Sequence, residues 1–388
     1  MESYALWLTS WYPTTLSPYD GDFIQRHAKA VFLYQKVVVV YVKKDDKGII
    51  TKKNKKTISV NSNLTEVVVY YHPKKTGIKF IDRIISFLIY QILYYRTIKE
   101  VIREKGVPFL IHAHIIKHIA LLCLMLKRKI KKPLIVSEQW TGFLQDNVES
   151  FKKENSVYKW LWKKLFKKAD QVTVVSKVLG QSLQTLFGIK NFVVVQNVVD
   201  TNIFSPSITN KKVDNVFVHI SNGFEQKNVP EILQAFNLIK KQGLDFSFHL
   251  FVPVQKKLRE LIEKLDLKNN IILHGEVPQS KLAETLQESS ALILYSQYET
   301  FGCVVIEANA VGVPAILSDL EVFREFCIEN ETCLFAPKND AIELARVISN
   351  FIKWDNNFDN AKIAERTQKL FSFDAVGKQF GSVYRSVL

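Results

Sequence analysis

The sequence predicts an α/β protein built from two doubly wound parallel sheets. Short stretches rich in Val, Ile and Leu alternate with amphipathic helical stretches along the whole chain, which is the pattern of parallel sheets covered by helices. A length of 388 residues favours two domains over a single core. A hydrophobic content of 47% with 23% charged residues is typical of a folded globular chain.

The first half opens with a strand at residues 4–10, a loop that contains Gly21, and a helix at residues 23–33. Further strands are expected at residues 36–42, 57–60, 66–71, 109–114, 133–137 and 169–176, and further helices at 78–104, 117–126 and 151–168. The helix at 78–104 is rich in Ile, Leu, Phe and Tyr, so it either packs into the core or turns an apolar face to a membrane. The helix at 151–168 combines an aromatic face with flanking lysines, which suits either an anionic bilayer or the edge of the sheet.

The second half begins after the polar segment 209–212, where we place the domain boundary. Residues 1–208 then form the first domain and residues 209–371 the second. Strands are expected at residues 216–220, 247–252, 271–274, 290–295, 314–317 and 333–336, with helices from Pro230 and from residue 304 and at 321–329, 341–353 and 372–388.

Charge is distributed unevenly between the two halves. Residues 1–200 hold 33 Lys and Arg against 15 Asp and Glu, a net charge of +18, whereas residues 201–388 hold 20 against 23, a net charge of −3. This asymmetry indicates that the first half faces an anionic partner, either a membrane surface, a phosphorylated lipid or nucleic acid. The alternative is a basic surface without a partner.

Other features narrow the class of protein. The four cysteines show neither a CxxC pair nor a disulfide framework, which fits a reducing compartment, and no cluster of His, Cys, Asp or Glu has metal-ligand spacing. Residues 1–4 lack the basic and apolar regions of a signal peptide, and the longest apolar run, residues 84–95, is too short to span a bilayer. We therefore expect a cytoplasmic protein that needs no metal or other cofactor.

One stretch, residues 298–308, combines a glycine turn, a helix N-terminus and two carboxylates. Gly302 follows a buried strand and precedes a helix, so the amides of Gly302, Cys303 and Val304 would form an anion site at the helix N-terminus. Glu299 on the loop and Glu307 one turn into the helix could accept hydrogen bonds from sugar and ribose hydroxyls. The alternative is a pair of glutamates in solvent at the helix end.

Other chemistry-bearing residues also follow predicted strands. Gly21 lies in a loop at the carboxyl edge of the first sheet, where α/β proteins bind ligands. His112 and His114 end the strand at 109–114, and from the alternation of side chains we expect only one of them to face a ligand. They are otherwise a polar strand end with satisfied imidazoles. Lys227 stands before a helix N-terminus and could neutralise a diphosphate.

The stretch at 298–308 also carries a resemblance to a known family. Glu299 and Glu307 flank seven residues that include Phe301-Gly302, and Ala308-Asn309-Ala310-x-Gly312-x-Pro314 follows. This pattern resembles the donor-site signature of retaining GT-B glycosyltransferases of family GT4. The resemblance runs from residue 7 to the C-terminus. It implies a GT-B fold, in which two Rossmann-like domains face an interdomain cleft and the helix at 372–388 crosses back to the first domain.

The resemblance also implies roles for individual residues. His114, Glu299 and Lys227 would be catalytic, with His114 contacting the transferred sugar. The donor would be bound by Gly21, Asn222, Gly223, Lys227, Glu299, Phe301, Gly302, Cys303, Val304 and Glu307. The chain departs from the family at Asn222-Gly223-Phe224, where an Arg is usual, and at Gln139, where a His is usual. Asn222 or amides near Gly223 would replace the Arg, and Trp140 and Thr141 are the candidate acceptor contacts.

The function implied is transfer of a hexosyl group, with retention, from a UDP- or GDP-sugar to a glycan or lipid-linked acceptor in bacterial surface polysaccharide synthesis. The basic first domain would bring the cytoplasmic enzyme to the inner face of the membrane. Three alternatives stay open: a catalytically silent GT-B protein that binds nucleotide-sugar, a nucleotide-sugar epimerase or hydrolase, and a nucleic-acid-binding protein. No nucleic-acid recognition motif supports the last of these.

Overall fold

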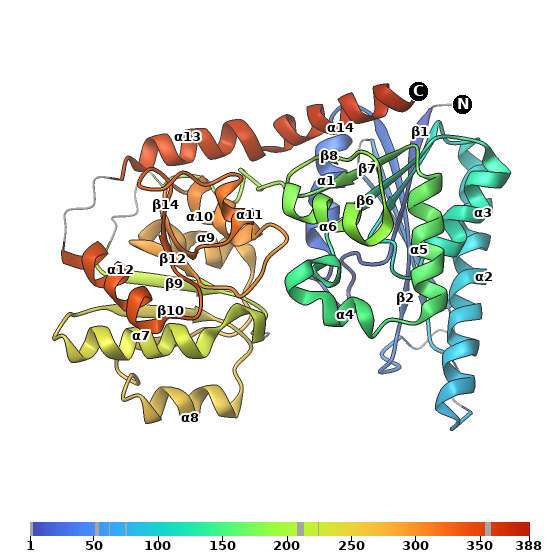
Figure 1. Cartoon of the computed structure of the whole chain (residues 1–388). Coiled ribbons are helices and arrows are strands. Elements are labelled where there is room, and N and C mark those ends of the chain that lie inside the picture. Colours follow the sequence, from blue (N-terminus) through green and yellow to red (C-terminus); the bar gives the residue numbers. More distant parts are fainter. Residues whose placement is uncertain are drawn as a thin grey trace. The chain divides into compact units, whose positions relative to one another are not determined.

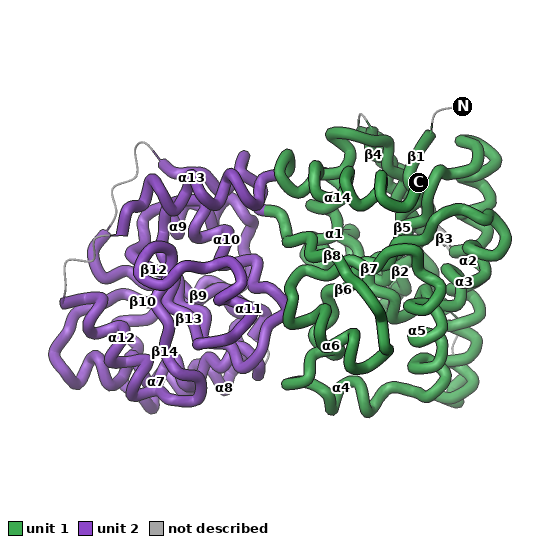
Figure 2. Tube along the Cα trace, turned by 45° about the horizontal axis from the view of Figure 1, so that its top comes forward, with its two compact units in different colours: residues 1–198, 373–388 green, residues 199–372 purple. Residues whose placement is uncertain are grey.

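The chain forms two compact units in the computed structural model, which describes residues 3–50, 54–61, 63–73, 76–207, 213–223, 225–353 and 358–388. Unit 1 comprises Met1–Val198 with Phe373–Leu388, and unit 2 comprises Val199–Ser372 (Figure 2). The units therefore part within the chain at Val198 and at Ser372. The predicted boundary segment, 209–212, lies outside the described residues.

Unit 1 is organised around a sheet of strand order β3-β4-β2-β1-β5-β6-β7-β8 (Figure 1). Its neighbouring strands pair in parallel except β3 and β4, which pair antiparallel at the edge. The strands are β1 (Tyr4–Thr9), β2 (Lys36–Lys44), β3 (Asn54–Asn61), β4 (Leu64–Tyr71), β5 (Leu110–His114), β6 (Leu134–Glu138), β7 (Gln171–Val174) and β8 (Val193–Val194).

The helices of unit 1 connect these strands. They are α1 (Asp22–Val31), α2 (Lys79–Lys105), α3 (Ala120–Ile130), α4 (Val148–Lys152), α5 (Ser156–Lys168), α6 (Lys177–Phe187) and α14 (Phe373–Val387), with short 3-10 turns at Thr141–Phe143 and Gln145–Asn147. The helix predicted at 151–168 is divided into α4 and α5. Asn155 starts α5, because its side-chain oxygen accepts a hydrogen bond from the Val157 N–H.

The C-terminal helix α14 belongs to unit 1, as the family resemblance implies. It packs on α1, where a Cβ on Gly377 would lie 2.4 Å from the Ala30 carbonyl oxygen, so only glycine allows this approach. Tyr384 of α14 lies in the core and accepts a hydrogen bond from Trp7 Nε1 at 3.0 Å. The crossover helix is therefore a part of the first domain's core.

Unit 2 contains a parallel sheet of strand order β11-β10-β9-β12-β13-β14. The strands are β9 (Val216–Ile220), β10 (Ser247–Phe251), β11 (Ile271–Leu273), β12 (Ala291–Leu294), β13 (Ala315–Ser318) and β14 (Cys333–Ala336). The helices are α7 (Val229–Lys241), α8 (Lys256–Lys264), α9 (Gln279–Glu288), α10 (Cys303–Ala310), α11 (Glu321–Arg324), α12 (Ala341–Lys353) and α13 (Asn360–Phe371), with a 3-10 turn at Glu225–Lys227.

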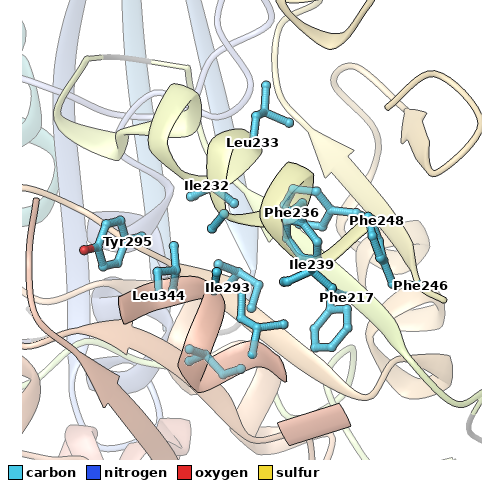
Figure 3. Close-up of a cluster of buried hydrophobic side chains, with 14 of the residues drawn as sticks. Phe217, Ile232, Leu233, Phe236, Ile239, Phe246, Phe248, Ile293, Tyr295 and Leu344 are labelled. Carbon is cyan, nitrogen blue, oxygen red and sulfur yellow. The ribbon is translucent and has the colours of Figure 1, made fainter. Parts of the chain in front are cut away.

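An aromatic and aliphatic core fixes the sheet of unit 2 to its helices (Figure 3). Phe236 of α7 stacks on Phe248 of β10 with ring centroids 4.2 Å apart, and Phe217 of β9 packs beside them. Ile293 of β12 and Leu344 of α12 are fully buried in the same cluster. The apolar alternation read from the sequence thus becomes one continuous core.

The strand order reverses in the same way in both sheets, which confirms the predicted α/β fold class. In unit 1 the chain fills one side of β1 with β2 and β4, and then the other side from β5 onwards. In unit 2 it fills one side of β9 with β10 and β11, and then the other side from β12. Open α/β sheets bind ligands where the strand order reverses in this way, at the carboxyl ends of the strands. The candidate ligand-binding segments are therefore the loops after β1 and β5 and those after β9 and β12.

Candidate functional site

The reversal point of unit 2 brings two predicted loops together. The loop after β9 and the loop after β12 are joined by a main-chain hydrogen bond from the Gln297 N–H to the Gln226 oxygen at 2.7 Å. Lys227 lies at the end of the first loop and Glu299 on the second, 72 positions later in the chain. Residues from the two predicted motifs thus share one edge of the sheet.

Lys227 and Glu299 form an ion pair at this edge. The Lys227 ammonium donates to Glu299 Oε1, and the two side chains are 14% and 6% exposed. Ser296 Oγ donates to the same carboxylate oxygen at 2.8 Å. The alternative of a glutamate in solvent is therefore wrong for Glu299. Sequence reasoning named both charges, but not their pairing or the supporting Ser296.

The N-terminus of α10 stands directly after this pair. Gly302 caps the helix with φ +92°, and a Cβ there would lie 2.8 Å from the Phe323 ring, so the position requires glycine on two counts. Cys303 and Val304 form the half-buried first turn, whose amides have no acceptor within their own helix. Glu307 is 4% exposed, which again excludes a glutamate in solvent.

Phe301 has a structural role that the signature did not reveal. Its side chain is 1% exposed and stacks on Phe326 with ring centroids 4.6 Å apart. Phe371 meets it edge to face at 6.0 Å. The Phe301 ring therefore anchors the loop to the core, and only its main chain is left for a donor contact.

The loop after β9 is held by a buried histidine. His219 Nδ1 donates to the Ile293 carbonyl at 2.8 Å, so its Nε2 accepts from Ser221 Oγ at 2.8 Å. The Gly223 N–H in turn donates to Ser221 Oγ at 3.2 Å. Burial lowers the pKa of His219 to about 4, so the ring is neutral at pH 7. This network fixes the stretch that carries Asn222 and Gly223, both exposed; Phe224 lies outside the described residues.

The reversal point of unit 1 separates His112 from His114. Both side chains are buried, with ring centroids 4.0 Å apart, and both rings contact Trp7. The expectation that only one faces the ligand side was wrong, because residues two apart in a strand share a face. His112 is fully hydrogen-bonded, whereas neither ring nitrogen of His114 has a hydrogen-bond partner among the described residues.

A chain of hydrogen bonds accounts for His112. Tyr384 accepts from Trp7 and therefore donates its own hydroxyl to His112 Nδ1 at 2.8 Å. His112 Nε2 then donates to Ser137 Oγ at 2.6 Å. Both nitrogens of His112 are therefore hydrogen-bonded within the protein, which is the alternative to a ligand contact that the sequence left open. His114 differs, since both of its buried ring nitrogens are without a hydrogen-bond partner among the described residues.

The imidazoles of His27, His112 and His114 are neutral at pH 7, because burial lowers the pKa of each ring. Burial is the largest cause that lowers the pKa of His114 well below its usual value, with His112 and His27 adding to the shift. His27 Nε2 is hydrogen-bonded to the Gln196 carbonyl at 3.0 Å, and Gln139 Nε2 donates to His27 Nδ1 at 3.3 Å. The departure at Gln139 is therefore accommodated by His27. His114 is suited to exchange hydrogen bonds and not to carry a positive charge.

Glu138, which sequence reasoning did not select, holds the loop that follows His114. Ile115 adopts φ +54°, a left-handed conformation that is costly for a β-branched residue. Glu138 Oε1 accepts from the next amide, Ile116 N–H, at 2.7 Å, and Oε2 accepts from the N–H groups of Gln139 and Trp140 at 3.2 and 3.4 Å. Burial raises the pKa of Glu138 to about 7. In the sequence, the signal for this role of Glu138 is a lone acidic residue at the end of a predicted strand.

Gly21, Trp140 and Thr141, the other residues of unit 1 predicted to contact a ligand, have roles in the local structure. Gly21 caps α1 with φ +74°, and a Cβ there would lie 2.7 Å from the main chain of Trp11, which explains the glycine without a ligand. The Trp140 ring folds over Gly142, where a Cβ would be 2.2 Å away, and Lys117 Nζ lies 4.4 Å from its centroid. Thr141 begins the 3-10 turn that follows.

The described residues contain neither a cluster suited to a metal ion nor a helix suited to span a membrane. Within those residues, no group of three or more His, Cys, Asp or Glu side chains is placed to hold a metal ion. No helix in the same part of the chain has the length and apolar character needed to cross a membrane.

Comparisons with known proteins show which family the chain resembles in sequence. The family model "Glycosyl transferases group 1" matches residues 200–369, and "Glycosyltransferase Family 4" matches residues 64–203. The N-acetyl-alpha-D-glucosaminyl L-malate synthase of Bacillus anthracis is 25% identical over 57% of this chain and 60% of its own length. A colanic acid biosynthesis glycosyltransferase, WcaL, of Salmonella typhimurium is 25% identical over 42% of this chain. The chain thus spans 60% and 43% of the lengths of these two relatives.

Solved structures share the fold. Sucrose-phosphate synthase from Thermosynechococcus elongatus superposes with a TM-score of 0.78 at 17% identity, covering 98% of both chains. Anabaena HepE, solved in complex with UDP and glucose, superposes with a TM-score of 0.70 at 14% identity, covering 98% of this chain and 99% of its own. Identities this low show the fold alone. With both family models matched in sequence and the GT-B fold matched over nearly the whole length, the chain belongs to the group 1 glycosyltransferases.

Proposed function

We propose that the protein transfers a hexosyl group from a nucleoside-diphosphate sugar to a hydroxyl of a glycan or lipid-linked acceptor. The observation that carries this proposal is the Lys227–Glu299 pair at the reversal point of unit 2, directly before the first turn of α10. A cation and helix amides suit a diphosphate, and buried carboxylates suit sugar hydroxyls. This combination serves a nucleotide-sugar better than either charge would alone.

In unit 2, we assign the donor to these residues. The Lys227 ammonium has three N–H donors, and Glu299 accepts one of them, so the ion pair holds the ammonium in place while leaving donors for a phosphate oxygen. Glu299 would orient the sugar, and Glu307 would accept from the ribose hydroxyls. Negative charge grows on the departing diphosphate during transfer, and Lys227 with the amides of Cys303 and Val304 would stabilise it without a metal.

In unit 1, we assign a sugar contact to His114. A neutral buried imidazole with two available nitrogens can accept from one hydroxyl and donate to another, which orients the sugar near its anomeric carbon. In the reaction, the bond from the anomeric carbon to the diphosphate oxygen breaks and a bond to the acceptor oxygen forms. The proton of the acceptor hydroxyl passes to the departing diphosphate, and the nucleoside diphosphate leaves. We propose that the anomeric configuration is retained.

The acceptor class follows from relatives and charge. WcaL and the O-antigen chain mannosyltransferase RfbU of Salmonella typhimurium, which is 26% identical over 43% of this chain, are named for surface polysaccharides. The charge of +18 on residues 1–200 favours an anionic or lipid-linked glycan and an anionic membrane surface beside it. We therefore propose a role in bacterial surface polysaccharide synthesis.

The donor assignment is tested by single substitutions in unit 2. Lys227→Ala and Glu307→Ala should abolish binding of the preferred nucleotide-sugar in isothermal calorimetry, because each removes a polar group aimed at the donor. Lys240→Ala is the matched control, since Lys240 is a partly exposed lysine of the same unit that pairs with the exposed Asp266. Wild-type affinity in both site variants, with the fold intact by circular dichroism, would refute the assignment.

A second candidate is a protein that binds nucleotide-sugar without turnover. Asn222 favours it, because an uncharged side chain stands where related enzymes place a second cation. The two candidates separate in an assay for nucleoside diphosphate release with and without a panel of glycan acceptors. Release that needs an acceptor supports the transferase, whereas tight binding with no release supports the silent protein. Release without any acceptor would indicate a hydrolase.

A further inference from the structure

Helix α2 carries a row of exposed apolar side chains along one face. Their spacings of three and four residues place them in a line. The row, here called the aliphatic ridge, consists of Ile81, Ile84, Leu88 and Ile92, which are 40%, 45%, 52% and 48% exposed, with Ile78 at 57% and Phe80 at 72% at its start. Single exposed apolar residues are ordinary, but a continuous row indicates a contact surface.

The opposite face of α2 is already fixed to the core of unit 1. The Tyr94 hydroxyl, fully buried, is hydrogen-bonded to the Thr9 and Val40 carbonyls at 2.9 and 2.5 Å. Nearer the start of the helix, Tyr71 and Ser86 share a buried hydrogen bond of 3.2 Å. This face of α2 therefore makes the core packing that the sequence predicts for the helix. The aliphatic ridge is a second apolar face, which a surface helix does not need for folding.

Basic side chains continue the same line toward the end of α2. Arg96, Lys99 and Arg103 follow Ile92 at spacings of four, three and four, and all three are exposed. The acidic Glu100 is turned to one side, where it pairs with Lys56 at 2.7 Å. The exposed line thus passes from aliphatic to cationic with no acidic residue on it, which is the pattern of a helix that lies on an anionic bilayer.

The aliphatic ridge lies beside the reversal point of unit 1. Gln91, in the middle of the helix, donates from Nε2 to the His118 carbonyl at 2.9 Å, and His118 is four residues after His114. Tyr90 also packs on the His118 ring, with centroids 6.4 Å apart. Figure 1 shows α2 along the outer side of unit 1. A surface that contacts α2 would therefore lie next to the edge where His114 is assigned its sugar contact.

We propose that the aliphatic ridge of α2 is the surface by which unit 1 docks on an anionic phospholipid bilayer. The apolar side chains enter the interface between headgroups and acyl chains, and Arg96, Lys99 and Arg103 contact the lipid phosphates. A second copy of this chain fits less well, because its own residues 1–200, with a net charge of +18, would meet the same face. The inference deepens the membrane partner in the proposed function, but it does not depend on donor chemistry.

Vesicle co-sedimentation tests the docking surface. Wild-type protein should bind vesicles of phosphatidylglycerol and phosphatidylcholine but not phosphatidylcholine alone, and binding should weaken with salt. The triple variant Ile84→Ser, Leu88→Ser, Ile92→Ser should bind anionic vesicles about tenfold more weakly or worse, because three apolar anchors are lost. Arg96→Glu with Lys99→Glu should remove the preference for anionic lipid. All these residues are exposed, so the variants should fold.

A matched control and two contrary outcomes complete the test. The triple variant Ile272→Ser, Ile328→Ser, Ile342→Ser removes exposed apolar residues of unit 2, at 46%, 39% and 71% exposure, and should bind vesicles as the wild type does. Wild-type vesicle binding by the ridge variant would overturn the proposal. So would a ridge variant that only converts a dimer to a monomer in analytical ultracentrifugation. Donor binding in calorimetry should be unchanged, which separates failure of docking from failure of the proposed function.

Discussion

At the scale of a residue, His112 and His114 show that neighbouring side chains determine whether a buried imidazole is hydrogen-bonded. The two imidazoles lie in one strand, on one face, and in van der Waals reach of each other. Only one has its nitrogens satisfied, because Tyr384 and Ser137 hydrogen-bond to His112, whereas no described residue hydrogen-bonds to the nitrogens of His114. The sequence names both residues, but the partners come from α14 and β6, which no local pattern connects to β5.

Substitution by phenylalanine should separate the two histidines. His114→Phe keeps a ring against Trp7 and removes no protein hydrogen bond, so the free energy of unfolding should change by about 1 kcal/mol or less. Its glycosyl transfer, measured as kcat/KM, should fall by about a hundredfold. His112→Phe leaves Tyr384 and Ser137 without their shared partner and should cost about 2–4 kcal/mol in urea unfolding. Equal destabilisation by both substitutions, with transfer intact in His114→Phe, would contradict the assignment.

The glycine that begins α10 gives a second prediction at this scale. Gly302→Ala should lower the free energy of unfolding by about 2–4 kcal/mol, because it combines a left-handed φ with a close contact to Phe323. Gly243→Ala is the control, since Gly243 also has positive φ, +73°, but no atom within 4 Å of its added Cβ. The control should lose only about 1 kcal/mol. Similar losses in the two variants would show that Phe323 yields at no cost.

At the scale of elements, Glu138 links the ends of β5 and β6. It carries no helix or metal pattern, and its function becomes visible only when the two strands lie side by side. There it receives the Ile116 amide and holds the strained residue Ile115 after His114. The raised pKa of this carboxyl, about 7, makes the junction sensitive to pH in the neutral range.

Comparison of wild type with Glu138→Gln should reveal this sensitivity. The usual pKa of 4.5 applies to the unfolded chain, so between about pH 4.5 and 7 the unfolded state loses the proton while the folded state keeps it. Stability contributed by this group is thus present below pH 4.5 and lost as pH rises through 7. One pKa unit equals about 1.4 kcal/mol, so the wild-type advantage over Glu138→Gln should shrink by roughly 3 kcal/mol between pH 4 and 8. A difference in unfolding free energy that is constant with pH would refute the account.

Local patterns predicted most elements, but they missed helices α6, α8, α9 and α13 and the break before α5. The predicted bounds of β9, β14 and α12 match the structure at both ends. The break before α5 was missed, although Asn155 is a favourable N-cap residue. Helix α13 was also missed, although Asp359 caps it by accepting from the Lys362 N–H. In both cases a short side chain overrides a longer apolar pattern.

At the scale of the whole molecule, the topology of the two sheets determines where candidate site residues come together. The two sheets reverse their strand order at β1–β5 and at β9–β12, and the predicted site residues fall at these points. The sequence predicts this arrangement because parallel sheets place every strand's carboxyl end at one edge. It does not predict the Lys227–Glu299 pair or the exposed face of α2, since both depend on which segments pack together in three dimensions.

Titration of the wild-type protein with UDP-, GDP- and ADP-sugars tests the central claim most directly. Isothermal calorimetry should show saturable, one-site binding of at least one nucleotide-sugar, and the same affinity in the presence of EDTA, because Lys227 and the α10 amides supply the positive charge. Binding that EDTA abolishes would contradict the metal-free site. Absence of binding to every member of the panel would contradict the donor site itself, and with it the assignment of transfer to this chain.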